Sequence, residues 1–283
     1  MGPSHQQKQA AKTLSKCKPT SDFKTRLLSA LVLAPIVIFL AWLGGYWFAG
    51  LMIVIAAIMF WEWTTITLRA IDVRRDLGAG IAILALIIAF IITSEMKPIL
   101  LSFALIVIGA AIIGLLRRKI GWTVAGIGVA SSLALCLLYI RNTPNPETGL
   151  ILLIFVCFSV WAADIFAYLV GRSLGGPKLM PKVSPKKTWS GFIGGLLGAI
   201  VTGSIVAYLA YPDKLFLFSL SAFILALAAQ AGDLIESAIK RHFNVKDASN
   251  LIPGHGGILD RVDGLTLAAY AFVIIHAIGL LSL

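Results

Sequence analysis

Charged residues are scarce in this chain, and acidic residues are the scarcest. Among 283 residues, Asp and Glu together number 13, and charged residues of both signs make up 13%, against about 25% in typical soluble proteins. Hydrophobic residues reach 59%, and so few polar side chains cannot cover a water-facing globule. The composition excludes a soluble enzyme and a disordered protein, and it predicts a polytopic integral membrane protein built of helices.

Cysteine is also scarce, and the three cysteines form no pattern. Cys17 lies in a polar N-terminal stretch, whereas Cys136 and Cys157 lie inside apolar runs. Disulfide frameworks and metal sites both need cysteines at characteristic spacings, which are missing here. The sequence therefore excludes a small secreted scaffold held together by disulfides.

Long apolar runs occupy most of the chain, and a membrane-spanning helix needs roughly 20 such residues. We expect an all-α fold with about nine transmembrane helices, at residues 27–43, 46–64, 78–96, 98–116, 122–140, 149–171, 189–210, 214–240 and 264–283. The seventh span contains Gly191, Gly194, Gly195 and Gly198. These glycines are expected to allow close helix packing rather than to bind phosphate.

Basic residues are unevenly distributed, which predicts the orientation of the chain. Lys and Arg number 24 and give a net charge of +11. They gather in the N-terminal tail and in every second loop, and the intervening loops hold only Lys97, Arg141 and Lys214. By the positive-inside rule, the N-terminus and the two long loops at 172–188 and 241–263 are expected to be cytoplasmic.

Acidic residues gather where the last span begins. Asp260 and Asp263 are three residues apart, so they share one face of a helix, and Asp233 approaches from the preceding span. Because Mg²⁺ prefers few carboxylates together with phosphate oxygens, the three are predicted to bind one or two such ions. For Glu236 and Lys240, a local salt bridge at a solvated helix end is an equal alternative to a role in the site.

A glycine-rich turn, Gly254-His255-Gly256-Gly257, precedes this acidic pair. Glycine tolerates positive φ, and successive backbone N–H groups bind anions. A tight turn without a ligand produces the same pattern. His255 is either a candidate hydrogen-bond donor to a phosphate group or a simple turn residue. No role as a general base is expected.

The second polar cluster is basic and lies just before the seventh span. Thr188 is expected to cap the helix that begins at Trp189, which places Ser184, Lys186 and Lys187 beside that helix start. A helix N-terminus flanked by lysines favours phosphate. The alternatives are that these lysines only set the orientation or attract anionic lipid.

Two further acids lie within or beside predicted spans. Asp164 is one turn from Tyr168 in the sixth span and is expected to be functional, because ionisable groups inside a membrane usually have a role. A hydrogen bond that packs helices is the alternative. Glu62 lies between Trp61 and Trp63 near the inner interface, where we expect its side chain to reach toward water.

Together, these clusters indicate a reaction class. Carboxylates that bind metal and lysines that bind phosphate, at the cytoplasmic edge of a helical bundle, suit phosphoryl or nucleotidyl transfer to a membrane-bound acceptor. The chain is accordingly expected to divide into a basic cytoplasmic tail at 1–26, an N-terminal membrane region of about five helices at 27–148, and a C-terminal catalytic region at 149–283.

Residues 237–263 resemble the signature of the phosphatidate cytidylyltransferases. The matching pattern is S-x-(aliphatic)-K-R-x4-K-D-x-(small)-x2-(aliphatic)-P-x-H-G-G-(aliphatic)-x-D-R-(aliphatic)-D. The resemblance extends to Gly232-Asp233-Leu234, to residues 184–189, and to Asp164 with Gly171-Arg172.

The resemblance implies that CTP and phosphatidic acid react to give CDP-diacylglycerol and pyrophosphate at the cytoplasmic face of the inner (plasma) membrane. It also implies Mg²⁺, with K⁺ as a candidate companion, a homodimer, and no nucleic-acid partner. The catalytic positions implied are Asp233, Asp260, Asp263, Lys240 and Arg241, the three aspartates being the metal ligands. The substrate-binding positions implied are Asp164, Ser184, Lys186, Lys187, Thr188, Lys246, Asp247, His255, Gly256, Gly257 and Arg261.

Two other functions remain open from the residues alone. A transporter for an anionic solute predicts that Asp164 is central and the 237–263 motif dispensable. A CTP-dependent lipid kinase predicts release of CDP instead of pyrophosphate.

Overall fold

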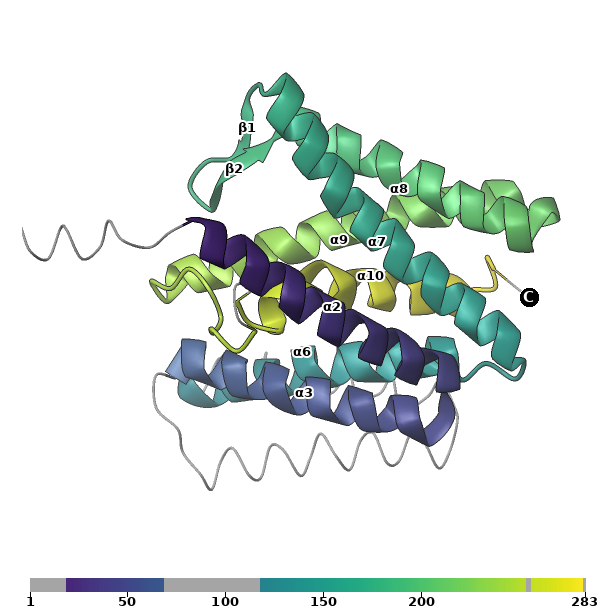
Figure 1. Cartoon of the computed structure of the whole chain (residues 1–283), viewed down its shortest axis with the longest axis horizontal. Helices are drawn as coiled ribbons and strands as arrows, with labels where there is room; N and C mark the ends of the chain where they lie inside the picture. The colour runs from purple at the N-terminus through teal and green to yellow at the C-terminus, as the bar shows by residue number, and fades with distance from the viewer. Residues whose placement is uncertain (1–18, 69–117, 253–255, 282–283) are drawn as a thin grey trace, which may run out of the picture.

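The computed structural model describes residues 19–68, 118–252 and 256–281, and helices dominate them (Figure 1). The helices are α2 (Pro19–Leu43), α3 (Gly45–Leu68), α6 (Arg118–Arg141), α7 (Pro146–Leu174), α8 (Trp189–Ala210), α9 (Leu215–His242) and α10 (Leu259–Ala277), with a 3-10 helix, η1, at Pro212–Lys214. Two strands, β1 (Lys178–Met180) and β2 (Ser184–Thr188), lie between α7 and α8.

Helix α10 lies at the centre of the bundle. It packs against α9 and α6 and also contacts α7 and α3, and Figure 1 shows it between α9 and α6. Helices α7, α8 and α9 pack together on one side, and α3 pairs with α6 on the other. Ala268, Ala269 and Phe272 on α10 are buried, so the apolar core runs along this helix.

Local sequence signals explain several helix boundaries. Gly44 has a φ of 66° and separates α2 from α3, a conformation that glycine adopts without strain. The Asn145 side chain caps α7 by accepting a hydrogen bond from the Glu147 N–H at 3.0 Å. Thr188 caps α8 by accepting from the Gly191 N–H at 3.2 Å. The cap predicted at Thr188 is therefore confirmed.

Glycines on α8 allow it to lie close against α7. A Cβ at Gly194 would lie 2.6 Å from the Cβ of Val170, and a Cβ at Gly195 would lie 2.8 Å from the carbonyl oxygen of Ala163. Larger residues would push the two helices apart at these contacts. The packing role predicted for this glycine-rich stretch is confirmed.

Membrane-spanning helices account for much of the described chain. Five segments are long and apolar enough to cross a membrane: Gly45–Thr67, Gly121–Arg141, Pro146–Leu174, Trp189–Ala210 and Pro212–His242. They correspond to the predicted spans at 46–64, 122–140, 149–171, 189–210 and 214–240, and they show a polytopic membrane protein. The predicted spans at 78–96 and 98–116 lie outside the described residues.

The first and last predicted spans have different boundaries in the structure. Helix α2 begins at Pro19, inside the predicted tail at 1–26, and its apolar part is the shorter stretch Leu31–Leu43. Helix α10 begins at Leu259, so Asp260 lies in its first turn and Asp263 in the next turn, both within the helix rather than before it.

The all-α prediction missed a small antiparallel β-hairpin in the loop at 172–188. Strands β1 and β2 pair so that Lys178 lies opposite Thr188 and Met180 opposite Ser184. Prolines recur every four residues in this loop, and each disfavours helix in the residue before it. With helix disfavoured, the loop instead forms two short extended strands that pair with each other.

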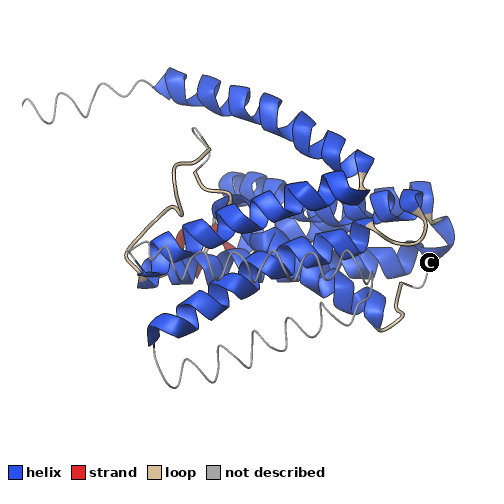
Figure 2. Ribbon diagram, turned by 90° about the horizontal axis from the view of Figure 1, so that it is seen from below, coloured by secondary structure: helices blue, strands red, loops and turns tan. Residues whose placement is uncertain are grey.

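The two polar loops lie at the same end of the bundle. The hairpin between α7 and α8 and the loop between α9 and α10 both lie on the left in Figure 1, where α2 also begins. Figure 2 shows the helices running along a common long axis with the strands at one end. This arrangement agrees with the prediction that both loops share one side of the membrane.

Arg141 forms a buried clamp at the opposite end, although the charge count treated it as a loop residue. It ends α6 and is only 6% exposed. Its guanidinium donates to the carbonyl oxygens of Ala41 at 2.7 Å, Trp42 at 2.8 Å and Pro146 at 3.1 Å. Carbonyls at a helix C-terminus lack intrahelical partners and carry negative partial charge. Arg141 therefore joins the end of α2 to α6 and α7.

Replacing Arg141 by Met should lower the free energy of unfolding by about 2–4 kcal/mol, because the change removes a charged donor and leaves partly buried carbonyls without this partner. Thermal unfolding of the purified protein in detergent measures this loss. Arg141→Lys keeps the charge but offers a single nitrogen, so a smaller loss is expected. An Arg141→Met protein as stable as the unmodified protein would contradict the clamp.

Candidate functional site

A cavity of about 770 Å³ opens at the end of the bundle where the two polar loops lie. Its walls come from α7, the β-hairpin, and parts of α8, α9 and α10. The predicted site residues that line it are Asp164, Lys186, Lys187, Thr188, Asp233, Lys240, Asp247, Asp260, Arg261 and Asp263. The acidic and basic clusters, which are far apart in the sequence, therefore face one shared space.

Other predicted site residues lie outside the lining of this cavity. Ser184 and Lys246 are not among the lining residues, and neither is Arg241. The exposed Arg241 side chain donates to the carbonyl oxygen of Val245 at 3.1 Å, just past the end of α9. His255 lies outside the described residues.

Gly256 and Gly257, the two described residues of the glycine-rich turn, are not among the residues that line the cavity either. Gly256 has a φ of 87°, as expected for glycine in such a turn, and its N–H donates to the Ile252 carbonyl at 3.1 Å. The Gly257 N–H donates to Oδ2 of Asp260 at 3.0 Å. The N–H groups of Gly256 and Gly257, predicted to bind a substrate anion, are thus already bonded within the protein.

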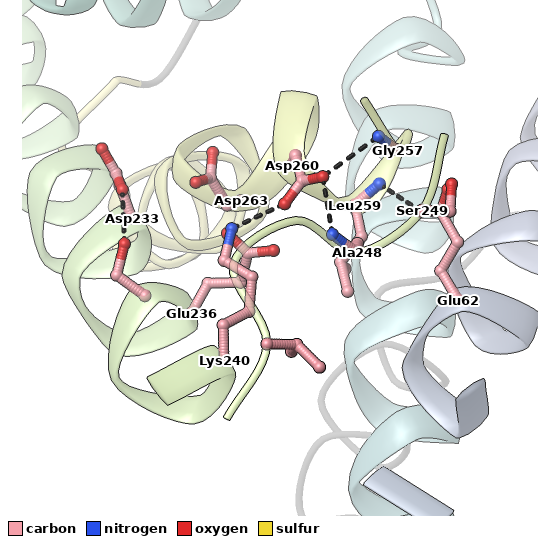
Figure 3. Close-up of polar contacts among 12 residues, drawn as sticks. Glu62, Asp233, Glu236, Lys240, Ala248, Ser249, Gly257, Leu259, Asp260 and Asp263 are labelled. Carbon is pink, nitrogen blue, oxygen red and sulfur yellow. Dashed lines mark hydrogen bonds and ion pairs between the residues drawn. The ribbon is translucent and has the colours of Figure 1, made fainter. Parts of the chain in front are cut away.

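Lys240 connects two carboxylates in the wall of the cavity. Its Nζ lies 2.9 Å from Oε2 of Glu236 and 2.6 Å from Oδ1 of Asp260 (Figure 3). Lys240 is 9% exposed and Glu236 is 7% exposed. The salt bridge between Glu236 and Lys240 is therefore present, but it is a buried three-residue network that joins α9 to α10 rather than a solvated helix end.

Asp260 is bonded through both of its carboxylate oxygens. Oδ1 accepts from Lys240, whereas Oδ2 accepts from the Ala248 N–H at 2.8 Å and from the Gly257 N–H. A buried carboxylate whose two oxygens both accept hydrogen bonds holds together the segments that donate those bonds. Asp260 therefore holds the first turn of α10 against α9 and against the loop between the two helices.

Asp233 and Asp263 present their carboxylates to the cavity. Both line it together with Asp164, and the charges of both act on the Asp164 carboxylate. Oε1 of Glu236 is buried beside Asp263, and no described group donates a hydrogen bond to it. Figure 3 shows Asp263 between Asp233 and Asp260. Carboxylates gathered in this way repel one another unless a cation lies among them.

The donor set fits a hard cation of the kind predicted from the sequence. Mg²⁺ is usually bound by one or two carboxylates, and water and substrate phosphate oxygens complete its shell. Asp233 and Asp263 supply that number, and Oε1 of Glu236 is buried without a hydrogen-bond donor. Within the described residues, no three His, Cys, Asp or Glu side chains form a compact metal-binding group. The assignment of Asp260 as a third ligand stays a prediction.

The opposite wall of the cavity is basic and is built by the hairpin and α7. Lys187 on β2 forms an ion pair with Asp233 on α9, which holds the hairpin against the acidic wall. Arg172 on α7 donates to the hydroxyl oxygen of Tyr168 at 2.7 Å, and both residues line the cavity. An anion that enters the cavity would meet lysine and arginine on one side and carboxylates on the other.

Glu62 is a residue that the sequence analysis misplaced. Instead of reaching toward water from the membrane interface, it is fully buried, with 0% of its surface exposed. Its carboxylate accepts from the Ser249 hydroxyl at 2.6 Å and from the backbone N–H groups of Ile258 at 3.0 Å and Leu259 at 2.6 Å. The partners lie about two-thirds of the chain away, so no local pattern could have revealed them.

Replacing Lys240 by Met should destabilise the protein by about 3–5 kcal/mol, because it leaves Glu236 and Asp260 buried without their cation. Thermal unfolding in detergent measures the effect. Lys182→Met, which changes an exposed lysine at the tip of the hairpin, is the matched control and should leave stability unchanged. Equal stability of the two variants would show that the network has no structural role.

Comparison with known proteins identifies relatives over nearly the whole chain. Residues 24–278 match the cytidylyltransferase family. A phosphatidate cytidylyltransferase from Brucella abortus is 40% identical over 261 residues, which cover 91% of this chain and 94% of the relative. One from Rickettsia bellii is 33% identical over 276 residues, covering 94% and 96%. One from Bacillus subtilis is 44% identical over 135 residues, covering 46% and 49%. Because the first two matches cover nearly the full length of both proteins, the chain belongs to the phosphatidate cytidylyltransferase family.

Proposed function

We propose that this protein is a phosphatidate cytidylyltransferase that transfers the cytidylyl group of CTP to phosphatidic acid. The observation that carries the proposal is the near-full-length similarity to enzymes of that name. The cavity supports it, since one wall is acidic and the other basic, as transfer between two phosphates requires. The products are CDP-diacylglycerol and pyrophosphate.

The reaction is a displacement at the α-phosphorus of CTP. A phosphate oxygen of phosphatidic acid forms a new bond to that phosphorus, while the bond to the oxygen bridging the α- and β-phosphates breaks. The electron pair of the broken bond leaves with pyrophosphate. The attacking oxygen is already anionic near neutral pH, so the site needs no strong base, and positioning and charge neutralisation supply the catalysis.

The basic wall binds and orients the phosphates. Lys186 and Lys187 line the cavity at the start of α8, and Arg172 lines it from α7. Lys187 is paired with Asp233, so this lysine is held beside the acidic wall, where it would meet a phosphate that enters the cavity. Arg172 offers a planar set of donors that suits a phosphate group. These side chains neutralise the charge that would otherwise keep two anionic substrates apart.

Asp233 and Asp263 would hold Mg²⁺, with Asp260 as the third predicted ligand. When bound, the ion neutralises charge on the phosphates and on the leaving pyrophosphate. Lys240 holds Asp260 in place through its 2.6 Å contact. The resemblance to the family supports Mg²⁺ and a companion K⁺.

The lipid substrate reaches the cavity from the side of the membrane. Exposed apolar side chains of α7, Ile165 and Leu169, lie next in sequence to Asp164 and Tyr168, which line the cavity. A lipid phosphate can therefore enter the polar cavity while its acyl chains stay against an apolar helix face. The distribution of basic residues supports a cytoplasmic orientation in the inner membrane, and the family resemblance supports a homodimer.

Purified protein incubated with labelled CTP, phosphatidic acid and Mg²⁺ should transfer the cytidine label into the chloroform phase and release pyrophosphate. The control omits phosphatidic acid and should leave the label in water. Release of CDP with a phosphorylated lipid would instead identify a lipid kinase. Folded protein that yields neither product would exclude the proposal.

Asp263→Asn should lower kcat at least about a hundredfold, because the charge stabilisation supplied by a metal ion is worth several kcal/mol. The comparison variant is Asp213→Asn, which changes an exposed aspartate in η1 away from the cavity and should retain full activity. Assays over a range of Mg²⁺ concentrations complete the test, and chelation with EDTA should abolish turnover. An active Asp263→Asn protein with an unchanged Mg²⁺ requirement would refute the metal assignment.

A further inference from the structure

Glu62 is the one buried carboxylate of α3 in the described chain, and it contacts the start of α10 from the N-terminal half of the protein. Its two oxygens accept three hydrogen bonds, from the Ser249 hydroxyl and from the N–H groups of Ile258 and Leu259. Figure 3 shows the Glu62 side chain extending from α3 toward this segment. It does not line the cavity, so it does not touch substrate.

A carboxylate at this place has a clear physical reason. The first N–H groups of an α-helix have no intrahelical acceptors, and the helix dipole places positive partial charge there. The residue at the cap position of α10, Ile258, offers no side-chain acceptor. Glu62 supplies the missing acceptor from another helix, and the helix start in turn compensates the buried negative charge of Glu62.

The turn before α10 is shaped to admit Glu62. A Cβ at Gly257 would lie 2.6 Å from Oε1 of Glu62, so only glycine leaves room for the carboxylate. The Gly257 N–H bonds to Asp260, whose other oxygen binds Lys240. The first turn of α10 is therefore held between two carboxylates, Glu62 on one side and Asp260 on the other.

We propose that Glu62 is a positioning residue of the nucleotidyl-transfer site. It fixes the N-terminus of α10, and thereby it sets where Asp260 and Asp263 lie relative to Asp233 across the cavity. This inference rests on the proposed function for its effect on turnover, but the local effect on α10 does not depend on it.

The test is Glu62→Gln in the full-length protein. Glutamine keeps the size of the side chain but replaces one acceptor oxygen by an NH₂ donor, so one of the N–H groups of α10 or the Ser249 hydroxyl loses its bond. We expect kcat to fall about tenfold or more, equal to about 1.4 kcal/mol of transition-state stabilisation, while the KM for CTP stays nearly unchanged, because the hairpin lysines are untouched. The Mg²⁺ concentration for half-maximal rate should rise. Hydrogen exchange should quicken at 256–262 and remain as before in α8.

Glu147→Gln, which makes the same change at an exposed glutamate in the first turn of α7, is the matched control and should behave as the unmodified protein. If Glu62→Gln does not yield folded protein, Ser249→Ala removes only one of the three bonds and should give the same pattern on a smaller scale. Unchanged kcat in folded Glu62→Gln protein, or lower stability alone with normal exchange at 256–262, would overturn the inference. Inactivity of the unmodified protein would instead count against the proposed function, and the exchange measurement would still decide whether Glu62 holds α10.

Discussion

The site depends on the compensation of charge inside an apolar bundle. Removing an ion from water costs several kcal/mol, and the cost is recovered only when a partner lies close and the remaining hydrogen bonds are made. Lys240 meets this condition between Glu236 and Asp260, and Asp260 also accepts two backbone N–H groups. The contacts hold α9, α10 and the loop between them in one arrangement. Without them, the acidic wall of the cavity would have no fixed shape.

Compensation is complete on one side of this network and incomplete on the other. Asp260 is bonded on both oxygens, whereas Asp263 faces the cavity, Asp233 is paired with Lys187 from the opposite wall, and Glu236 keeps a buried oxygen without a donor. Negative charge left over beside a basic wall is the condition under which a cation and a phosphate are both attracted to one place. The hydrogen-bonded network around Lys240 therefore lies directly beside the carboxylates that face the cavity, since Glu236 is bonded to Lys240 and lies beside Asp263.

Helix ends also carry polar backbone groups without intrahelical partners. At two helix ends in this protein, a side chain from another helix supplies the missing hydrogen-bond partner. Arg141 donates to the carbonyls at the C-terminus of α2, and Glu62 accepts from the N–H groups at the N-terminus of α10. In an apolar environment such groups cannot rely on water. The two contacts lie at opposite ends of the bundle. Arg141 joins α2 to α6 and α7, whereas Glu62 holds the start of α10 beside the site.

The sequence by itself determined the membrane character, the seventh span at 189–210 to the residue, and most of the charged residues that line the cavity, because these follow from composition, local caps and a dense polar motif. It did not reveal the hairpin, the early start of α10, or the burial of Glu62 and Arg141. The burial of Glu62 and Arg141 depends on partners that are remote in sequence: Glu62 bonds to Ser249, 187 residues away, and Arg141 bonds to Trp42, 99 residues away. Only the tertiary structure decided which charges are paired and which face the cavity, since pairing is set by the distance between atoms and not by their order along the chain.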